Sequence, residues 1–315
     1  MYKIYVLLIA ALAAWNFGIP ELRAQQSEWV IYPDMKTITD IAQEGDFLWI
    51  TSTGGVAKLN RHTLESTLLT KANAGLPDHN IWTIAIQPDG KKWFGTQFHG
   101  LMLLDNNEWT VFTSENSPVR VPYPVVQGNN VWLRGNGDTL IHYDGQKWEV
   151  VDMSTVTEGV DKIGFPYGTN SSLWVGISSL SGGANSVGTA VYHLSNDTWS
   201  SIPLPSGMSI TTITPVASRN GALWFYGADK EIGQVLMRYD GTWTTLSIKD
   251  IGFAVKAYLL TIDSTGRLWL PSVENVIARY DGTTWQTLDL KNTPLDSANI
   301  TSMFTDSDGI VSLAS

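Results

Sequence analysis

Histidine side chains serve most often in proton transfer and metal binding near neutral pH, so they are the first candidates for chemistry. The chain contains five: His62, His79, His99, His142 and His193. No two of them lie at the short spacing that metal sites use, and the chain has no cysteine for a thiolate ligand, a nucleophile or a disulfide. We therefore expect no catalytic residue, no metal site and no cofactor. His99, which follows Gln97 and Phe98, is the best histidine candidate for a polar contact with a ligand.

Polar residues also recur at one distance before a series of regularly spaced tryptophans. The starting points are the six tryptophans and Ser312, which stands at the same position of a seventh, partial unit. Counting thirteen residues back from each gives a mostly polar set: Lys36, Asn80, Val119, Asp161, Thr211, Lys256 and Asn299. These positions are predicted to ring the mouth of a central channel, which makes Asn80, Asp161 and Lys256 candidate ligand contacts. Contact with solvent also favours polar side chains at a channel mouth, so solvation is the alternative explanation.

Two residues further along each unit lies a mostly aliphatic set: Ile38, Trp82, Val121, Ile163, Ile213 and Tyr258. The aliphatic majority predicts that this position belongs to the core of each unit, so Trp82 and Tyr258 are expected to be core residues. If either ring faced the channel instead, it could stack on a sugar ring. Both residues are therefore kept as candidate ligand contacts.

Two long connections are further candidates for binding, because loops on a rigid scaffold often carry function. They span residues 176–188 and 227–234, and the second supplies Lys230 and Glu231 as candidate contacts. Sequence drift in unconstrained loops is the alternative. Asp229 and Glu231 could also join a calcium site, although solvated loop charge is the simpler interpretation.

All these candidates are positioned by a repeat. One series of tryptophans is spaced 39 to 50 residues apart: Trp49, Trp93, Trp132, Trp174, Trp224 and Trp269. A second series runs beside it: Trp29, Trp109, Trp148, Trp199, Trp243 and Trp285. A period near forty residues with paired aromatic residues predicts an all-β fold, a β-propeller of four-stranded antiparallel blades.

The clearest unit spans residues 75–112. Strands are expected at residues 80–86, 92–95, 101–105 and 109–112, because β-branched and aromatic residues there alternate with turn signals. Gly90 and the pair Asn106 and Asn107 mark tight turns. The unit therefore predicts a four-stranded meander. His142 and His193 fall on the third strands of later units and are expected to be repeat positions.

These motifs resemble the two-component regulator propeller repeat, found in extracytoplasmic sensor regions of bacterial hybrid histidine kinases and in secreted proteins. The residues that carry the resemblance are Leu76-Pro77, Asn80-Ile81, Ile84, Asp89-Gly90, Trp93, Gly95-Thr96 and Gly100-Leu101. The resemblance covers about residues 29 to 315. It implies an oligosaccharide or protein partner at a bacterial envelope, and the kinase and linker parts of sensor proteins have no counterpart here.

The number of blades depends on the two ends of the chain. A seventh, partial unit covers residues 299–313, with Ser312 at the tryptophan position, and residues 28–32 resemble an orphan fourth strand. A seventh blade shared by both termini would close the ring and hide its strand edges. No segment is a candidate for the third strand of that blade. Six blades with loose ends are the alternative.

The N-terminus and the charge bear on location and partners. Residues 1–24 read as a signal peptide, with Lys3 before a twelve-residue apolar run from Ile4 to Trp15. We expect residues 25–315 to form a single secreted domain, periplasmic or extracellular, without membrane insertion after cleavage. The formal net charge of −10 argues against nucleic acid as a partner.

Three functions remain open. The first is a secreted, non-enzymatic propeller that binds an oligosaccharide or protein ligand with its variable loops, with a separate sensor or envelope protein as a further partner. The second is a carbohydrate-active or lyase-type enzyme, which requires an acid and a base that converge in the channel mouth. The third is an assembly scaffold of the envelope, which requires an exposed apolar patch on the outer rim.

Overall fold

The computed structural model describes residues 4–6, 30–32, 37–156, 162–178, 189–291, 293, 295 and 299–314. Strands dominate these residues, and the helices are one four-residue α-helix, α1 (Lys71–Ala74), and three short 3-10 turns. None of the helices in the described part is long and apolar enough to cross a membrane. The all-β prediction is confirmed.

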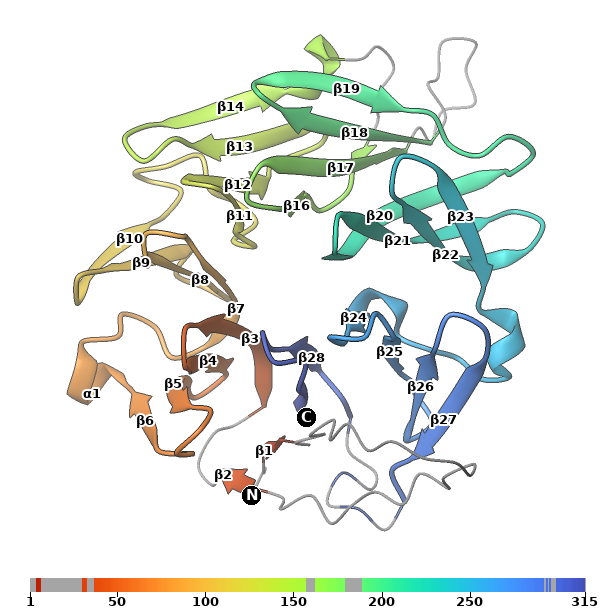
Figure 1. Cartoon of the computed structure of the whole chain (residues 1–315). Coiled ribbons are helices and arrows are strands. Elements are labelled where there is room, and N and C mark those ends of the chain that lie inside the picture. Colours follow the sequence, from red (N-terminus) through yellow and green to blue (C-terminus); the bar gives the residue numbers. More distant parts are fainter. Residues whose placement is uncertain are drawn as a thin grey trace.

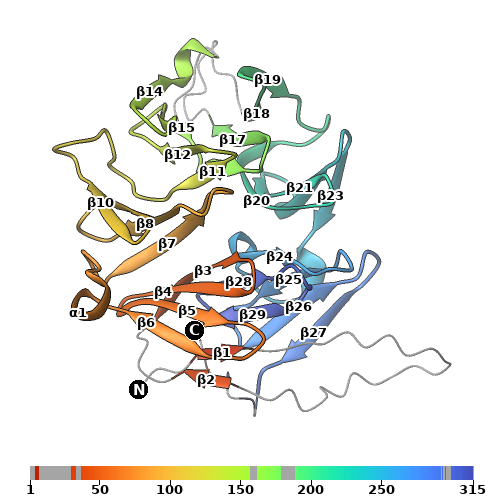
Figure 2. The same cartoon turned by 60° about the vertical axis from the view of Figure 1, so that its left-hand side comes forward.

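Six blades, each formed by one continuous stretch of chain, surround a central axis (Figures 1 and 2). Blade 1 contains β3 (Ile38–Glu44), β4 (Phe47–Ser52), β5 (Gly55–Asn60) and β6 (Ser66–Leu69). Blade 2 contains β7 (Ile81–Ile86), β8 (Lys92–Thr96), β9 (Leu101–Asp105) and β10 (Glu108–Phe112). Blade 3 contains β11 (Val125–Gln127), β12 (Asn130–Arg134), β13 (Thr139–Tyr143) and β14 (Trp148–Asp152). Blade 4 contains β15 (Lys162–Ile163), β16 (Tyr167–Gly168), β17 (Ser172–Ser178), β18 (Ala190–Ser195) and β19 (Thr198–Ile202). Blade 5 contains β20 (Ile210–Arg219), β21 (Ala222–Asp229), β22 (Gly233–Tyr239) and β23 (Trp243–Ser247). Blade 6 contains β24 (Thr261–Ile262), β25 (Leu268–Pro271), β26 (Val276–Tyr280) and β27 (Trp285–Asp289).

A further sheet joins the two ends of the chain. Its strand order is β2-β1-β29-β28, with β28 (Ser302–Thr305) and β29 (Val311–Ala314) from the C-terminal part and β1 (Ile4–Val6) and β2 (Val30–Tyr32) from the N-terminal part. The six continuous blades match the alternative blade count, and the two-ended sheet has the sharing of termini that the sequence predicts. Its third strand, β1, falls within residues 1–24, so cleavage of the predicted signal peptide would remove that strand.

The repeat unit folds as predicted. The four strands of blade 2 lie within one residue of the predicted bounds. Asn106 and Asn107, between β9 and β10, both have positive φ, at 49° and 68°, as the two-residue hairpin turn of type I′ requires. The four-stranded meander, and with it the propeller, is confirmed.

Each blade presents two kinds of connection. The connections between its first and second strands, and between its third and fourth strands, are short turns that form what we name the tight-turn face. The connections between its second and third strands, and from one blade to the next, form the opposite face, named here the loop face. The innermost strands, such as β3, β7 and β28, border the centre of the ring (Figure 1). The loop face therefore surrounds one end of the ring's central axis, and we name this end the channel mouth.

The tryptophan of the second strand is held in the same way in four blades. Its indole N–H donates to a side-chain oxygen at or beside the end of the first strand: Glu44 for Trp49, Gln87 for Trp93, Gln127 for Trp132 and Asp263 for Trp269. All four indoles are buried. Each blade thus buries a large apolar ring without leaving its one donor unpaired.

The two third-strand histidines are repeat positions, as predicted. His142 stacks on Trp132 with ring centroids 4.2 Å apart, and His193 stacks on Trp174 at 4.0 Å. Burial lowers the pKa of both imidazoles. Both rings therefore pack on the tryptophan of their own blade.

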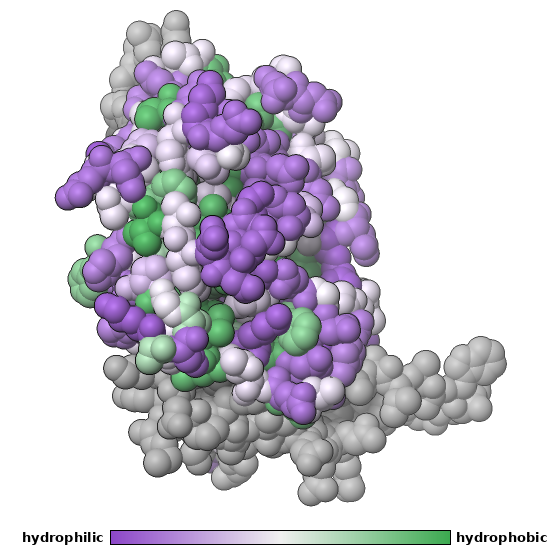
Figure 3. Space-filling view, turned by 90° about the vertical axis from the view of Figure 1, so that its left-hand side faces the viewer, coloured by the Kyte–Doolittle hydropathy of each residue, from purple (hydrophilic) through white to green (hydrophobic). Residues whose placement is uncertain are grey.

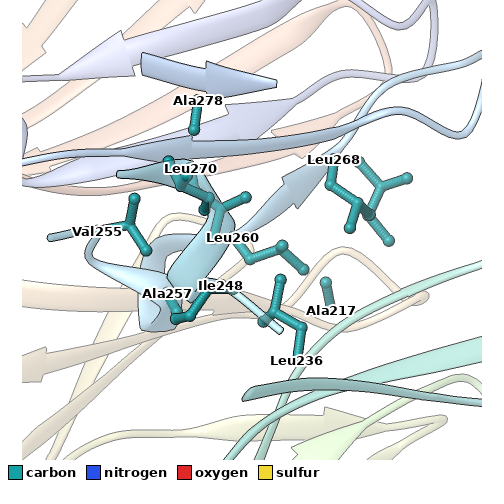
Figure 4. Close-up of a cluster of buried hydrophobic side chains, with 11 residues drawn as sticks. Ala217, Leu236, Ile248, Val255, Ala257, Leu260, Leu268, Leu270 and Ala278 are labelled. Atoms are coloured by element: carbon teal, nitrogen blue, oxygen red, sulfur yellow. The ribbon is translucent and has the colours of Figure 1, made fainter. Parts of the chain in front are cut away.

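Packing between neighbouring blades is close. A Cβ atom on Gly95 of β8 would lie 1.7 Å from the backbone oxygen of Pro122 in the next blade, so this position requires glycine. Between blades 5 and 6 the buried side chains are aliphatic, and Leu236 of β22 lies in one cluster with Leu268 and Leu270 of β25 (Figure 4). The blades therefore form a rigid support for the loops.

The outer rim carries little exposed apolar surface among the described residues. Figure 3 views the side on which β6, α1 and β10 lie and shows a largely hydrophilic surface with scattered apolar residues. Of the large apolar side chains that are exposed, Val150 on β14 is the one on a fourth strand. The described rim thus lacks the apolar patch that an assembly scaffold would need.

Candidate ligand-binding site

A hydrogen-bonded group of polar side chains lies on the loop face of blade 2. The His99 ring contacts Asp78 at 2.9 Å (Nδ1 to Oδ2), and Asp78 Oδ1 accepts the backbone N–H of Asn80 at 3.1 Å. The Asn80 side chain donates to Gln97 Oε1 and accepts the indole N–H of Trp82 at 3.2 Å. We name Asp78, Asn80, Gln97 and His99 the polar rim. The candidates Asn80, Trp82 and His99 therefore lie in one network.

Asp78 anchors this network from below the surface. Its side chain is 4% exposed, whereas that of His99 is 61% exposed. Burial alone would raise the pKa of the Asp78 carboxyl, but the backbone N–H of Asn80 and the His99 ring outweigh burial and lower that pKa. The exposed imidazole is thus held in place by a buried carboxylate.

Replacing Asp78 with asparagine is expected to lower the free energy of unfolding by about 1–3 kcal/mol at pH 7, the cost of losing hydrogen bonds to a buried carboxylate. Because the pKa of Asp78 is lower in the folded state, its contribution is fully present above the ordinary pKa of 3.8 and is lost as pH falls below it. Urea unfolding between pH 7 and pH 3 measures this difference. The gap between the wild type and the variant should narrow below pH 3.8.

The control is Asp46→Asn, which breaks the contact of Asp46 with His62 on the tight-turn face, where both side chains are more than half exposed. Exposed pairs contribute little to stability, so this variant should match the wild type within about 0.5 kcal/mol. An Asp78→Asn deficit that stays constant with pH would contradict the assignment to the Asp78 charge.

Three aromatic rings lie along the innermost segments of blades 2, 3 and 4. The rings of Trp82 and Tyr123 lie 6.3 Å apart, and those of Tyr123 and Phe165 lie 5.4 Å apart. Trp82 and Phe165 are each 40% exposed. We name these three residues the aromatic arc. At its far end Arg134, the last residue of β12, lies with its guanidinium carbon 5.4 Å from the Phe165 ring.

The prediction that Trp82 and Tyr258 are core residues is wrong. β7 contains a bulge between Ile81 and Thr83, which pair with consecutive residues of β8, so Trp82 has no place in the ladder and turns outward. Tyr258 lies on the 3-10 turn Ala257–Leu259, not on a strand, and is 61% exposed. In five blades a core residue pairs with the residue three positions after the second-strand tryptophan. Three of these core residues are as predicted, Ile38, Ile163 and Ile213. Ile81 and Val255 take this place in the blades of Trp82 and Tyr258.

Lys256 and Tyr258 lie on another side of the channel, on the inner segment of blade 6. The Lys256 ammonium donates to Asn299 Oδ1 at 2.5 Å and to the backbone oxygen of Ile300 at 2.8 Å. Burial lowers the pKa of Lys256. A cation with neutral partners therefore joins blade 6 to the segment that precedes β28.

The remaining candidates are not brought to the channel mouth. Lys230 and Glu231 are exposed in the β21–β22 connection, and no described contact joins them to the polar rim or the arc. The buried Asp229 accepts the backbone N–H groups of Ser209, Glu231 and Ile232, so its oxygens stabilise the loop. No group of three metal-ligating side chains occurs within the described ranges.

Other predicted positions differ in burial or lie outside the described residues. Val119 is buried, and the Thr211 hydroxyl donates to the backbone oxygen of Ala228, so neither offers a free polar group. Lys36 and Asp161 lie outside the described residues, as does most of the 176–188 connection. Of the acid and base candidates that the sequence offers, Lys256, Glu231 and His99 are described, and they lie on three blades without mutual contact.

Sequence reasoning missed Tyr123, Phe165 and Arg134. A signal for the two aromatic residues was present, since each lies nine residues before the tryptophan of its blade and directly before a proline. A residue before proline favours extended backbone, which suits an innermost segment. Arg134 carried no such signal, because its role depends on the neighbouring blade.

Comparison with known proteins adds evidence on the fold. The extracellular domain of the putative hybrid two-component system BT4673 from B. thetaiotaomicron is similar, with a TM-score of 0.62 and 18% identity over 90% of this chain and 37% of that one. That of BT3049 from the same organism gives 0.54 and 16%, over 90% and 40%. The GH74 enzyme of Niastella koreensis gives 0.51 and 14%, over 80% and 45%. The chain thus spans less than half the length of each.

No family model and no curated protein match the sequence. At these identities the solved structures show a shared β-propeller fold. Two of the three are extracellular domains of bacterial two-component systems, which is consistent with the resemblance to two-component regulator propellers.

Proposed function

We propose that this chain is a non-enzymatic, extracytoplasmic propeller that binds an oligosaccharide at the channel mouth on its loop face. The observation that carries the proposal is the exposure of the aromatic arc. Burying a large aromatic side chain is favourable, so exposed rings on a rigid inner segment suit a partner with a flat apolar face. The apolar face of a pyranose ring has this shape.

The polar rim supports the same proposal. Asn80 and Gln97 orient each other, and His99 is oriented by Asp78, so several donors and acceptors stand beside Trp82 in fixed positions. Sugar hydroxyls need such partners once they leave water. Since the blades hold these groups before the ligand arrives, little conformational entropy is lost on binding.

The sequence and the neighbours support a proposal on the location and partners of the protein. We propose that residues 1–24 direct export, and that the domain acts in the periplasm or outside the cell. Two similar structures are extracellular domains of hybrid two-component systems, so a separate sensor or envelope protein that responds to the loaded propeller is the natural partner.

A protein ligand on the same face is a second candidate function. Three exposed apolar side chains stand in connections between second and third strands: Phe98 (74% exposed), Val273 (63%) and Ile232 (37%). Exposed apolar residues in loops of one face are typical of protein contacts. The oligosaccharide is preferred because the rings of the aromatic arc contact one another, whereas no described contact joins these three residues.

Tryptophan fluorescence tests the proposal. Trp82 is the one exposed tryptophan among the described residues, so a ligand at the channel mouth should change its emission. Oligosaccharides that calorimetry identifies as ligands are titrated into the wild type and into Trp82→Phe, which keeps a ring for stacking. The variant should bind within a few-fold of the wild type and lose most of the change in emission.

Trp285→Phe is the matched control, because Trp285 lies on the outer strand β27 of blade 6. This variant should keep the ligand-induced change. If Trp82→Phe kept the full change in emission, the ligand would bind elsewhere. If no oligosaccharide bound by calorimetry while a protein partner did, the second candidate would replace the first.

A further inference from the structure

Ion pairs are distributed unequally between the two faces. Among the described residues, the pairs of lysine or arginine with a carboxylate lie on the tight-turn face: Arg61 with Asp306 and Asp308, Lys91 with Asp89 and Asp105, Lys92 with Glu44, Arg238 with Asp240, and Arg267 with Asp263. The loop face, in contrast, holds cations without a carboxylate partner in the described part of the chain.

Two of these cations border the channel mouth. Arg134 approaches the Phe165 ring, and its Nε is buried without a hydrogen-bond partner. Among the described residues, the partners of the Lys256 ammonium are the neutral oxygens of Asn299 and Ile300. The two cations come from blades 3 and 6, on different sides of the ring centre (Figure 1). The mouth is thus flanked by two positive charges.

A shortage of acidic residues does not explain why these two cations lack a carboxylate partner among the described residues. The chain has 30 acidic and 20 basic residues, so carboxylates are in excess. Withdrawing a cation from water without a counter-charge is costly, and burial lowers the pKa of Lys256, which is the sign of that cost. An anionic group on a ligand would supply the missing charge, and a guanidinium can bind a carboxylate or sulfate with two parallel hydrogen bonds.

We propose that the oligosaccharide is acidic, with carboxylate or sulfate groups that bind Arg134 and Lys256 while its rings stack on the aromatic arc. This inference rests on the proposed function and narrows it to one class of ligand. Because the two cations lie on different sides of the channel mouth, they would select oligosaccharides that carry a negative charge on more than one sugar unit. Uncharged sugars would keep the stacking and lose both charge-assisted contacts.

Matched pairs of probes test the inference by calorimetry. The first pair is oligogalacturonate and its fully methyl-esterified form, which differ in the carboxylate charge. The second pair is dextran sulfate and dextran, which differ in sulfate. At least one charged probe should bind at least about tenfold more tightly than its uncharged counterpart. Raising NaCl from 50 to 500 mM should weaken the charged probe alone.

Variants then test whether Arg134 and Lys256 are the residues that bind the anionic groups of the probe. Lys256→Gln and Arg134→Gln should each weaken the charged probe by about tenfold, while Lys256→Arg, which keeps the charge, should lose less. Binding of the uncharged counterpart should stay within twofold. Lys147→Gln is the matched control, because Lys147 is an exposed lysine beside the β13–β14 turn of the tight-turn face, and it should leave both affinities unchanged. Thermal unfolding checks that each variant is folded.

The outcomes separate the two proposals. Equal affinity for charged and uncharged probes would overturn the acidic class and leave oligosaccharide binding standing. A loss in Lys147→Gln as large as that in Lys256→Gln would also overturn it, since the effect would then come from overall charge. If no charged or uncharged sugar bound, both proposals would fail.

Discussion

Replacing Trp93 with alanine is expected to lower the free energy of unfolding by about 3–5 kcal/mol, the usual cost of removing a buried large aromatic side chain. Trp93 is fully buried, and its ring lies 5.6 Å from Phe112 and 5.4 Å from Tyr143. Tyr143 belongs to blade 3, so the indole fills space between two blades. The change also removes the 2.7 Å hydrogen bond to Gln87 Oε1, leaving a polar group inside the blade.

Urea unfolding followed by circular dichroism measures this effect. A domain has about 5–15 kcal/mol of stability in total, so the loss should move the midpoint far enough to be unmistakable. Trp93→Phe keeps a ring and should lose less, and Val150→Ala, at an exposed site, should stay within about 0.5 kcal/mol. A Trp93→Ala variant as stable as Val150→Ala would show that this indole does not hold the blades together.

The fold was accessible from the sequence because one unit is repeated. Each copy shows the same tryptophan and the same turn residues, so errors in one copy are corrected by the others. Asn106 and Asn107 predict a tight turn, and both adopt the positive φ that this turn needs. The third strand of the two-ended sheet was missed because Ile4–Val6 lies in an apolar run with no repeat motif.

The site was accessible only in part. Asn80 and His99 were found because position in the repeat places them on the loop face, and the structure joins them through Asp78. Trp82 was misplaced because counting back from the tryptophan assumes that the turn between the first two strands always has the same length. Ala42 pairs with Trp49 seven positions later, whereas Ala85 pairs with Trp93 eight positions later, so blade 2 has one extra residue in this turn. A one-residue shift exchanges the buried and exposed sides of a strand.

Residues that act across blades could not be found by reading units one at a time. Arg134 is the last residue of β12, but its contact is Phe165 in the next blade. Lys256 likewise contacts Asn299, 43 positions away in the chain. Such contacts depend on how closely neighbouring blades pack. Glycines such as Gly95 permit close packing, but the sequence of one unit does not specify the distance to the next blade.

Trp82→Ala is expected to weaken oligosaccharide binding by at least about 30-fold, the effect of losing about 2 kcal/mol at a central aromatic contact. Trp82 begins the aromatic arc and donates to Asn80, so its removal takes away both a stacking surface and the orientation of the polar rim. Because the side chain is 40% exposed, the variant should lose little stability. The loss therefore belongs to binding.

The affinity of Trp82→Ala, compared with that of Val150→Ala by titration calorimetry, tests most directly whether the channel mouth is the binding site. Val150 is also exposed and apolar but lies on the outer strand β14. The proposed site predicts a loss of at least about 30-fold for Trp82→Ala and no change for Val150→Ala. Equal affinities in the two variants would contradict it.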